Sequence, residues 1–230
     1  MVLKIVKTVW PVMLTYVAIG APCGMIMAQT GMEPWMVFAL SSTFVTGSGQ
    51  FMICNLWLAG VPAGSIVASV AAISSRFALY SASIAPHLTG ASKRQTLAVA
   101  ATLTEEAYGI SLAKLVEGDD WGPRESFALN VILIATWGVS CTAGAVAGAV
   151  IDVPTAIAGF VCTSLFICLL FSQRPSRGNV VAAVLAATSV AACKFLGWTN
   201  IAVPESVLVG VAAALACDAL ADGRGARDAR

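Results

Sequence analysis

Charged residues are scarce in this chain. Only 11% of its 230 residues are Asp, Glu, Lys or Arg, whereas 58% are hydrophobic. Because soluble domains carry about 25% charged residues, the composition excludes an ordinary soluble domain and indicates a membrane protein. The formal net charge is +1, so nothing in the charge balance indicates binding to nucleic acid or to an acidic partner.

Motifs for nucleotides, metals and hydrolysis are also missing. There is no GxxxxGK(S/T), GxGxxG or HExxH pattern and no CxxC pair, and His87 is the only histidine. The seven cysteines are scattered through apolar stretches, where cysteine is typical of small packing residues. We therefore expect no catalytic residue, no metal site and no cofactor. Transport, if any, must be driven by an ion gradient or by another subunit.

Long apolar runs are what the chain has instead. A helix needs about 20 residues to cross a bilayer, and runs of this kind cover 8–30, 35–59, 62–86, 95–115, 126–151, 154–172, 178–197 and 201–222. The runs are continuous and do not alternate, which favours helices over a barrel. We expect an all-α polytopic membrane protein, a bundle of eight transmembrane helices. It forms a single domain over 1–222, followed by a short charged tail at 223–230.

Basic residues orient the predicted spans. With both termini in the cytoplasm, most basic residues lie on the cytoplasmic side: Lys4, Lys7, Arg174, Arg177, Arg224, Arg227 and Arg230. This agrees with the positive-inside rule, but Lys93 and Arg94 break it, because eight crossings place them outside. Making 35–59 or 62–86 re-entrant moves these two residues inside and moves the 174–177 loop outside. Seven spans is therefore the alternative.

Three charges fall in the middle of predicted spans. Inserting a charged side chain at mid-membrane costs about 2.5–3.5 kcal/mol. We therefore expect Arg76, Glu105 and Glu106 to pair with each other or to bind a polar substrate. Adjacent helical residues point about 100° apart, so one glutamate can pair with Arg76 while the other faces a cavity. Burial and a neighbouring carboxylate favour proton uptake. The pair therefore suits proton coupling or ammonium binding.

The span 35–59 contains a weak point. The run Thr46-Gly47-Ser48-Gly49-Gln50 predicts a broken helix, whose exposed N–H groups are tolerated only beside protein or a polar cavity. Transporters use such helix ends to bind carboxylates, although small residues also allow a close helix crossing. Gln50 favours the cavity, since a buried amide needs partners.

The span 62–86 predicts one regular helix with a polar face. Ser69, Arg76, Tyr80, Ser83 and His87 recur at helical spacing. This face indicates a cavity, and the alternative is an Arg–carboxylate brace within the bundle.

Two further patterns concern helix packing. The segment Gly20-Ala21-Pro22-Cys23-Gly24 predicts a kink, which is either a hinge or a simple bend. Gly144 and Gly148 form a GxxxG motif, which predicts a close contact with another helix.

Three segments together resemble a known family. GSGQF (47–51), SRFALYSASIAPHL (75–88) and TEEAYG (104–109), at this spacing, resemble the AzlC family of branched-chain amino acid permeases over roughly residues 9–160. The chain departs from the family pattern at three positions: Ser74 stands where asparagine is usual, Phe77 where histidine is usual and Glu105 where aspartate is usual.

The resemblance implies export of branched-chain amino acids across a bacterial inner membrane, together with a small hydrophobic subunit of the AzlD type; a homo-oligomer is also open. With the residue patterns, it leads us to expect these substrate-binding residues: Gly47, Ser48, Gly49, Gln50, Phe51, Arg76, Tyr80 and Ser83. Glu105 or Glu106 is expected to take the ammonium group or a coupling proton. The alternative is a channel-like or structural subunit whose intramembrane charges only brace the bundle.

Overall fold

The fold is helical throughout the part of the chain that the structure describes. The structure, a computed structural model, describes residues 1–88, 90–118, 121–150 and 177–197, with isolated positions between 160 and 213. Every regular element in these residues is a helix, which confirms the all-α prediction. The predicted spans 154–172 and 201–222 lie almost wholly outside these residues, and the tail 223–230 lies fully outside them.

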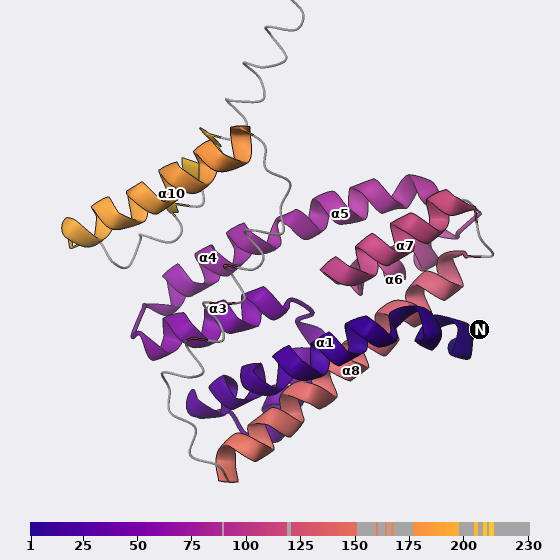
Figure 1. Cartoon of the computed structure of the whole chain (residues 1–230), viewed down its shortest axis with the longest axis horizontal. Helices are drawn as coiled ribbons and strands as arrows, with labels where there is room; N and C mark the ends of the chain where they lie inside the picture. The colour runs from indigo at the N-terminus through magenta and orange to yellow at the C-terminus, as the bar shows by residue number, and fades with distance from the viewer. Residues whose placement is uncertain are drawn as a thin grey trace, which may run out of the picture. The chain divides into compact units, whose positions relative to one another are not determined.

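The residues group into two compact units, Met1–Leu58 with Ser74–Ser164 and Ala59–Ile73 with Leu165–Arg230. The first unit contains α1 (Val2–Gln29), α2 (Pro34–Thr43), α3 (Gly47–Leu58), α5 (Arg76–Ile84), the 3-10 helix η1 (Ala85–His87), α6 (Lys93–Ala101), α7 (Glu105–Glu117) and α8 (Pro123–Val150) (Figure 1). The second contains α4 (Ala63–Ser74), except its last residue, and α10 (Arg177–Phe195).

The first unit is built on a close contact between α1 and α8. A Cβ added at Gly24 would overlap the carbonyl oxygen of Cys141, and one added at Gly144 would overlap the carbonyl oxygen of Ala21. Glycine on both helices thus lets the two backbones touch, which maximises van der Waals contact where lipid provides no hydrophobic driving force. The GxxxG prediction for α8 is confirmed. Pro22, the predicted kink, lies inside α1 without ending it.

The two helices run parallel. Gly20 lies against Ser140, Ala21 against Gly144 and Met25 against Gly148, so both sequences advance together. Parallel spans must be separated by an odd number of crossings. The seven-span alternative, with a single re-entrant segment, leaves two crossings between α1 and α8 and is therefore wrong.

The predicted span 35–59 is broken, as expected, and its two halves are α2 and α3. Ser42 at the end of α2 packs on Gly138, and Gly47 at the start of α3 packs on the neighbouring Trp137. The side chain of Gln50, one turn into α3, lies 3.4 Å from the hydroxyl of Ser41 in α2. The chain therefore turns back at the break, and α2 and α3 form a helical hairpin.

The predicted span 95–115 is broken in the same way. It comprises α6 and α7, and its break has the same length as the first, since Thr102–Thr104 corresponds to Phe44–Thr46. In both breaks the last threonine caps the following helix: Thr46 Oγ1 accepts the Gly49 N–H, and Thr104 Oγ1 accepts the Ala107 N–H. A polar side chain with a free lone pair thereby satisfies one of the unpaired N–H groups at each helix start.

The direction of α7 follows from chain length. Thr104 bonds Tyr16, whose ring contacts Trp137 at 5.3 Å between centroids, so α7 starts beside the middle of α8. Trp137 is about 21 Å along α8 from Pro123, and α7 is about 20 Å long. If α7 ran onward, Glu117 would be about 40 Å from Pro123. The five-residue connection cannot span this distance, since it reaches about 20 Å. Hence α7 turns back, and α6 and α7 form a second hairpin.

The two hairpins correct the predicted topology. Segments 35–59 and 95–115 were each expected to cross once, but each folds back on itself. Within the described residues three helical stretches are long and apolar enough to cross: α1, Ala63–His87 and α8. One crossing then separates the parallel α1 and α8, and α3 and α7 extend from the middle of that pair toward opposite ends (Figure 1). Eight crossings are thus too many, although the discontinuous helices were predicted.

The stretch 62–86 is also less regular than predicted. Ser75 separates α4 from α5, so Ser69 and Arg76 do not share one uninterrupted helix. The hydroxyl of Ser69 donates to the carbonyl of Ser65 in its own helix at 2.7 Å. The predicted five-residue polar face is therefore reduced to residues of α5 and η1.

The α1–α8 contact predicts different costs for two glycine substitutions. Gly144→Ala should destabilise the protein by about 1–3 kcal/mol, because overpacking a tight contact forces the backbones apart. Gly109→Ala in α7 is the matched control, since a Cβ there meets nothing within 4 Å. Thermal unfolding of both purified variants in detergent measures the difference. Equal melting temperatures would show that the two helices do not touch as described.

The second hairpin predicts which positions share a side of the membrane. Arg94→Cys and Glu117→Cys, at its two ends, should react with an impermeant maleimide from the same side, and Glu33→Cys should react from the other. The parental chain, whose described cysteines are buried, is the control for background labelling. Labelling of positions 94 and 117 from opposite sides would show that the segment 95–115 crosses the membrane once and forms no hairpin.

Candidate functional site

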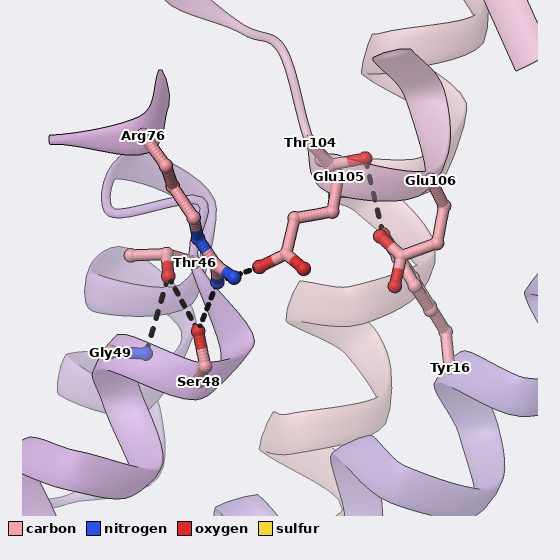
Figure 2. Close-up of polar contacts among 8 residues, drawn as sticks. All are labelled: Tyr16, Thr46, Ser48, Gly49, Arg76, Thr104, Glu105 and Glu106. Atoms are coloured by element: carbon pink, nitrogen blue, oxygen red, sulfur yellow. Dashed lines mark hydrogen bonds and ion pairs between the residues drawn. The ribbon is translucent and has the colours of Figure 1, made fainter. Parts of the chain in front are cut away.

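Arg76 connects the tips of the two hairpins. Its guanidinium donates to the Ser48 hydroxyl at 2.7 Å and forms an ion pair with Glu105 (Figure 2). Ser48 is the second residue of α3 and Glu105 the first of α7, while Arg76 is the first of α5. The predicted pairing of Arg76 with one glutamate is thus observed, and that glutamate is Glu105.

Two helix N-termini converge on this ion pair. The first N–H groups of a helix have no acceptor inside it, and the aligned peptide dipoles place about half a positive charge there. In α3 the amides of Gly47 and Ser48 have no partner among the described residues. The tips of α3 and α7 together with Arg76 create a strongly positive region, and Glu105 supplies its negative charge.

Glu106 points away from this pair. Its carboxylate accepts a hydrogen bond of 2.6 Å from the Tyr16 hydroxyl of α1, which also lies 3.2 Å from Thr104 Oγ1 (Figure 2). Tyr16 is only 6% exposed. The two adjacent glutamates therefore diverge, as their helical spacing predicted. Glu106, which was expected to face a cavity, instead accepts a hydrogen bond from Tyr16 of α1.

Gln50 and Phe51 are buried in the protein and face no cavity. Gln50 is fully buried; its amide donates to the carbonyl of Phe44 at 2.5 Å and accepts the indole N–H of Trp137 at 2.9 Å. Because both ends of the amide are used by the chain, the inference that Gln50 faces a cavity is wrong. Its role in this structure is to satisfy the carbonyl freed by the break and to hold α3 against α8.

The two glycines around Ser48 allow close packing at the α3 tip. A Cβ at Gly47 would lie 3.0 Å from Trp137, and one at Gly49 would lie 2.8 Å from Thr46. Small residues here bring the backbone of the hairpin tip near its neighbours. The first N–H groups of α3 therefore lie beside Arg76, which bonds the Ser48 hydroxyl.

Tyr80 and Ser83 lie one and two turns along α5 from Arg76. Tyr80 stacks on Tyr108 of α7 with ring centroids 4.6 Å apart, and the Ser83 hydroxyl lies 3.0 Å from the Tyr108 hydroxyl. They form an aromatic and hydroxyl wall beside the ion pair, and neither bonds Arg76. His87 is exposed at the end of η1.

Sequence patterns missed three residues that support the site: Tyr16, Trp137 and Asn130. The amide of Asn130, which is fully buried, donates to the carbonyl of Val99 and to Thr102 Oγ1, both at 3.0 Å. Asn130 thus donates to a backbone carbonyl next to the second break, as Gln50 does at the first. The available signal was a polar or hydrogen-bonding group in the middle of an apolar run, because such a group needs a partner in lipid.

Four cysteines lie in the described residues. Cys23, Cys54, Cys141 and Cys193 are buried and form no disulfide, which agrees with their interpretation as packing residues. The other three lie outside the described residues.

Comparisons with known proteins point to one family. The profile of the family described as AzlC protein matches residues 11–151. A relative is the inner membrane protein YgaZ of Escherichia coli (strain K12), 24% identical over 209 residues, which cover 87% of this chain and 82% of that protein. No solved structure matches the chain.

The hydrogen bond between Gln50 and Trp137 predicts a coupled loss of stability. Gln50→Leu leaves the buried Trp137 N–H without its acceptor, and Trp137→Phe removes the closest donor to the Gln50 side-chain oxygen. Each should therefore destabilise the protein by about 1–3 kcal/mol. The double variant should lose clearly less than the sum, since one bond cannot be lost twice. Unfolding of the three variants in one detergent measures the coupling. Strict additivity would mean that this bond does not hold α3 against α8.

Proposed function

We propose that this chain, which belongs to the AzlC family of membrane transporters, is a secondary transporter subunit that exports branched-chain or similar neutral amino acids. The resemblance noted in the sequence is confirmed at the level of the family. The observation that carries the proposal is Arg76 between the tips of two hairpins, paired with Glu105 and next to the α3 N-terminus.

The site has the chemistry of carboxylate recognition. A guanidinium presents several N–H donors in one plane and binds carboxylates in bidentate geometry, and N–H groups at a helix start bind anions. Broken helices that meet within a membrane domain are a recurring way to bind substrate carboxylates in transporters. In our proposal the substrate carboxylate binds Arg76 and the α3 tip.

An amino acid also brings an ammonium group. Glu105 and Glu106 supply carboxylates beside the Arg76 region, and either can receive the ammonium group or a coupling proton. We propose that the proton motive force drives export. The wall formed by Tyr80, Ser83 and Tyr108 is where we place an uncharged substrate side chain.

The hairpins also support a definite orientation. Because α1 and α8 are parallel and α6–α7 turns back, Lys4, Lys93, Arg94 and Arg124 all belong to one side. We propose that this side is the cytoplasm, which satisfies the positive-inside rule and removes the exception at Lys93 and Arg94. The membrane is proposed to be a bacterial inner membrane, as the name of the relative states for that protein.

The proposed subunit works with a small hydrophobic AzlD-type protein, on the basis of the family resemblance alone. A second candidate function is a structural subunit in which Arg76 only braces the hairpins, and it is favoured by the completed ion pair and the Ser48 bond. Saturable flux with competition between amino acids separates a transporter from a brace.

Transport should depend on Arg76. In vesicles containing the chain and its partner, Arg76→Gln should reduce counterflow of labelled leucine about 10- to 100-fold, because a hydrogen bond to a charged group contributes about 1.5–3 kcal/mol. Isoleucine, valine and methionine should show the same loss if they are substrates.

The matched control is Glu117→Gln, which removes the exposed ion pair between Glu117 and Lys114. It should leave leucine flux within about twofold, as expected for a surface pair. A folded Arg76→Gln protein with undiminished, saturable flux would disprove the assigned site. Flux that never saturates in the parental protein would argue against a transporter.

A further inference from the structure

The ion pair between Arg76 and Glu105 is complete but accessible. The side chains are 30% and 26% exposed, so a small molecule can reach both charges. The Nε atom of Arg76 is buried and has no hydrogen-bond partner in the described part of the chain. Arg76 thus retains a donor that neither Ser48 nor Glu105 satisfies.

Charge balance restricts what can enter between these two groups. In a low-dielectric setting each charge needs its counter-charge, and an unpaired one is expensive. A carboxylate alone would pair with Arg76 and leave Glu105 unpaired, and an amine alone would do the reverse. A zwitterion can separate the two side chains while leaving both of them paired.

We propose that an α-amino acid binds by inserting into the Arg76–Glu105 ion pair, with its carboxylate on Arg76 and its ammonium group on Glu105. This rests on the proposed function and assigns the ammonium group to Glu105 rather than Glu106. The assignment follows from geometry, because Glu106 is already held by the Tyr16 hydroxyl at 2.6 Å on the side of α1.

Insertion has a mechanical consequence. Arg76 joins the α3 tip through Ser48 and the α7 tip through Glu105. Replacing the direct contact with Glu105 by a bridging amino acid moves the α7 tip away from Arg76. Substrate binding therefore loosens the link between the two hairpins that enter from opposite sides.

The test is a reciprocal change of ligand charge. The full chain in nanodiscs is titrated with leucine, with 4-methylpentanoate, which lacks the ammonium group, and with 3-methylbutylamine, which lacks the carboxylate. The parental protein should bind leucine at least tenfold more tightly than either analogue. Glu105→Gln should bind 4-methylpentanoate at least tenfold more tightly than the parental protein does, and Arg76→Gln should show the same gain for 3-methylbutylamine.

Glu117→Gln is the control, and it should keep the parental preference. Because the variants are expected to gain affinity, misfolding cannot imitate the result. If the parental protein binds leucine but 4-methylpentanoate binds it equally well, or if neither variant gains its analogue, insertion is overturned while the proposed function stands. If the parental protein binds none of the three ligands, the proposed function falls and insertion falls with it.

Discussion

The arrangement of the first unit depends on one partly buried cation. Arg76 lies where the tips of two helical hairpins meet, and its guanidinium satisfies a hydroxyl of one tip and a carboxylate of the other. A partly buried guanidinium must keep such partners, because losing one leaves a poorly compensated charge. This requirement makes the two tips neighbours and places two helix N-termini at one point. The same arrangement explains why the point suits a small zwitterion.

The hairpins need support that their short helices cannot provide. The parallel pair α1 and α8 supplies it through glycine contacts that bring the backbones together. Gln50 and Asn130 then bond the carbonyls that each break releases. Each break is closed by a threonine cap and a side-chain amide. These bonds satisfy part of the backbone that the breaks expose within a membrane domain, while the first amides of α3 stay open beside Arg76 in the described part of the chain. Some polar residues that the sequence pattern assigns to substrate binding, such as Gln50, therefore have a structural role.

Segments 35–59 and 95–115 depart furthest from the topology that the sequence predicts. Apolar length predicted a crossing for each, and small or polar residues correctly predicted the breaks. The direction of the chain after a break is absent from that pattern, because a straight and a reversed pair of half-helices have the same composition. The anomalous Lys93 and Arg94 were the one trace of the reversal in the sequence. A single re-entrant segment accounts for them only by moving the 174–177 loop outside.

The sequence by itself determined the class of protein, the family, the residues that carry charge into the membrane and the divergence of Glu105 from Glu106. These follow from composition, motif spacing and helical periodicity, all of which are local. The tertiary structure decided that Arg76 pairs with Glu105, that Tyr16 holds Glu106 and that Gln50 is turned toward Trp137. Those outcomes join residues up to 90 positions apart, and only the packing of the hairpins on α1 and α8 selects them among many chemically equivalent pairings.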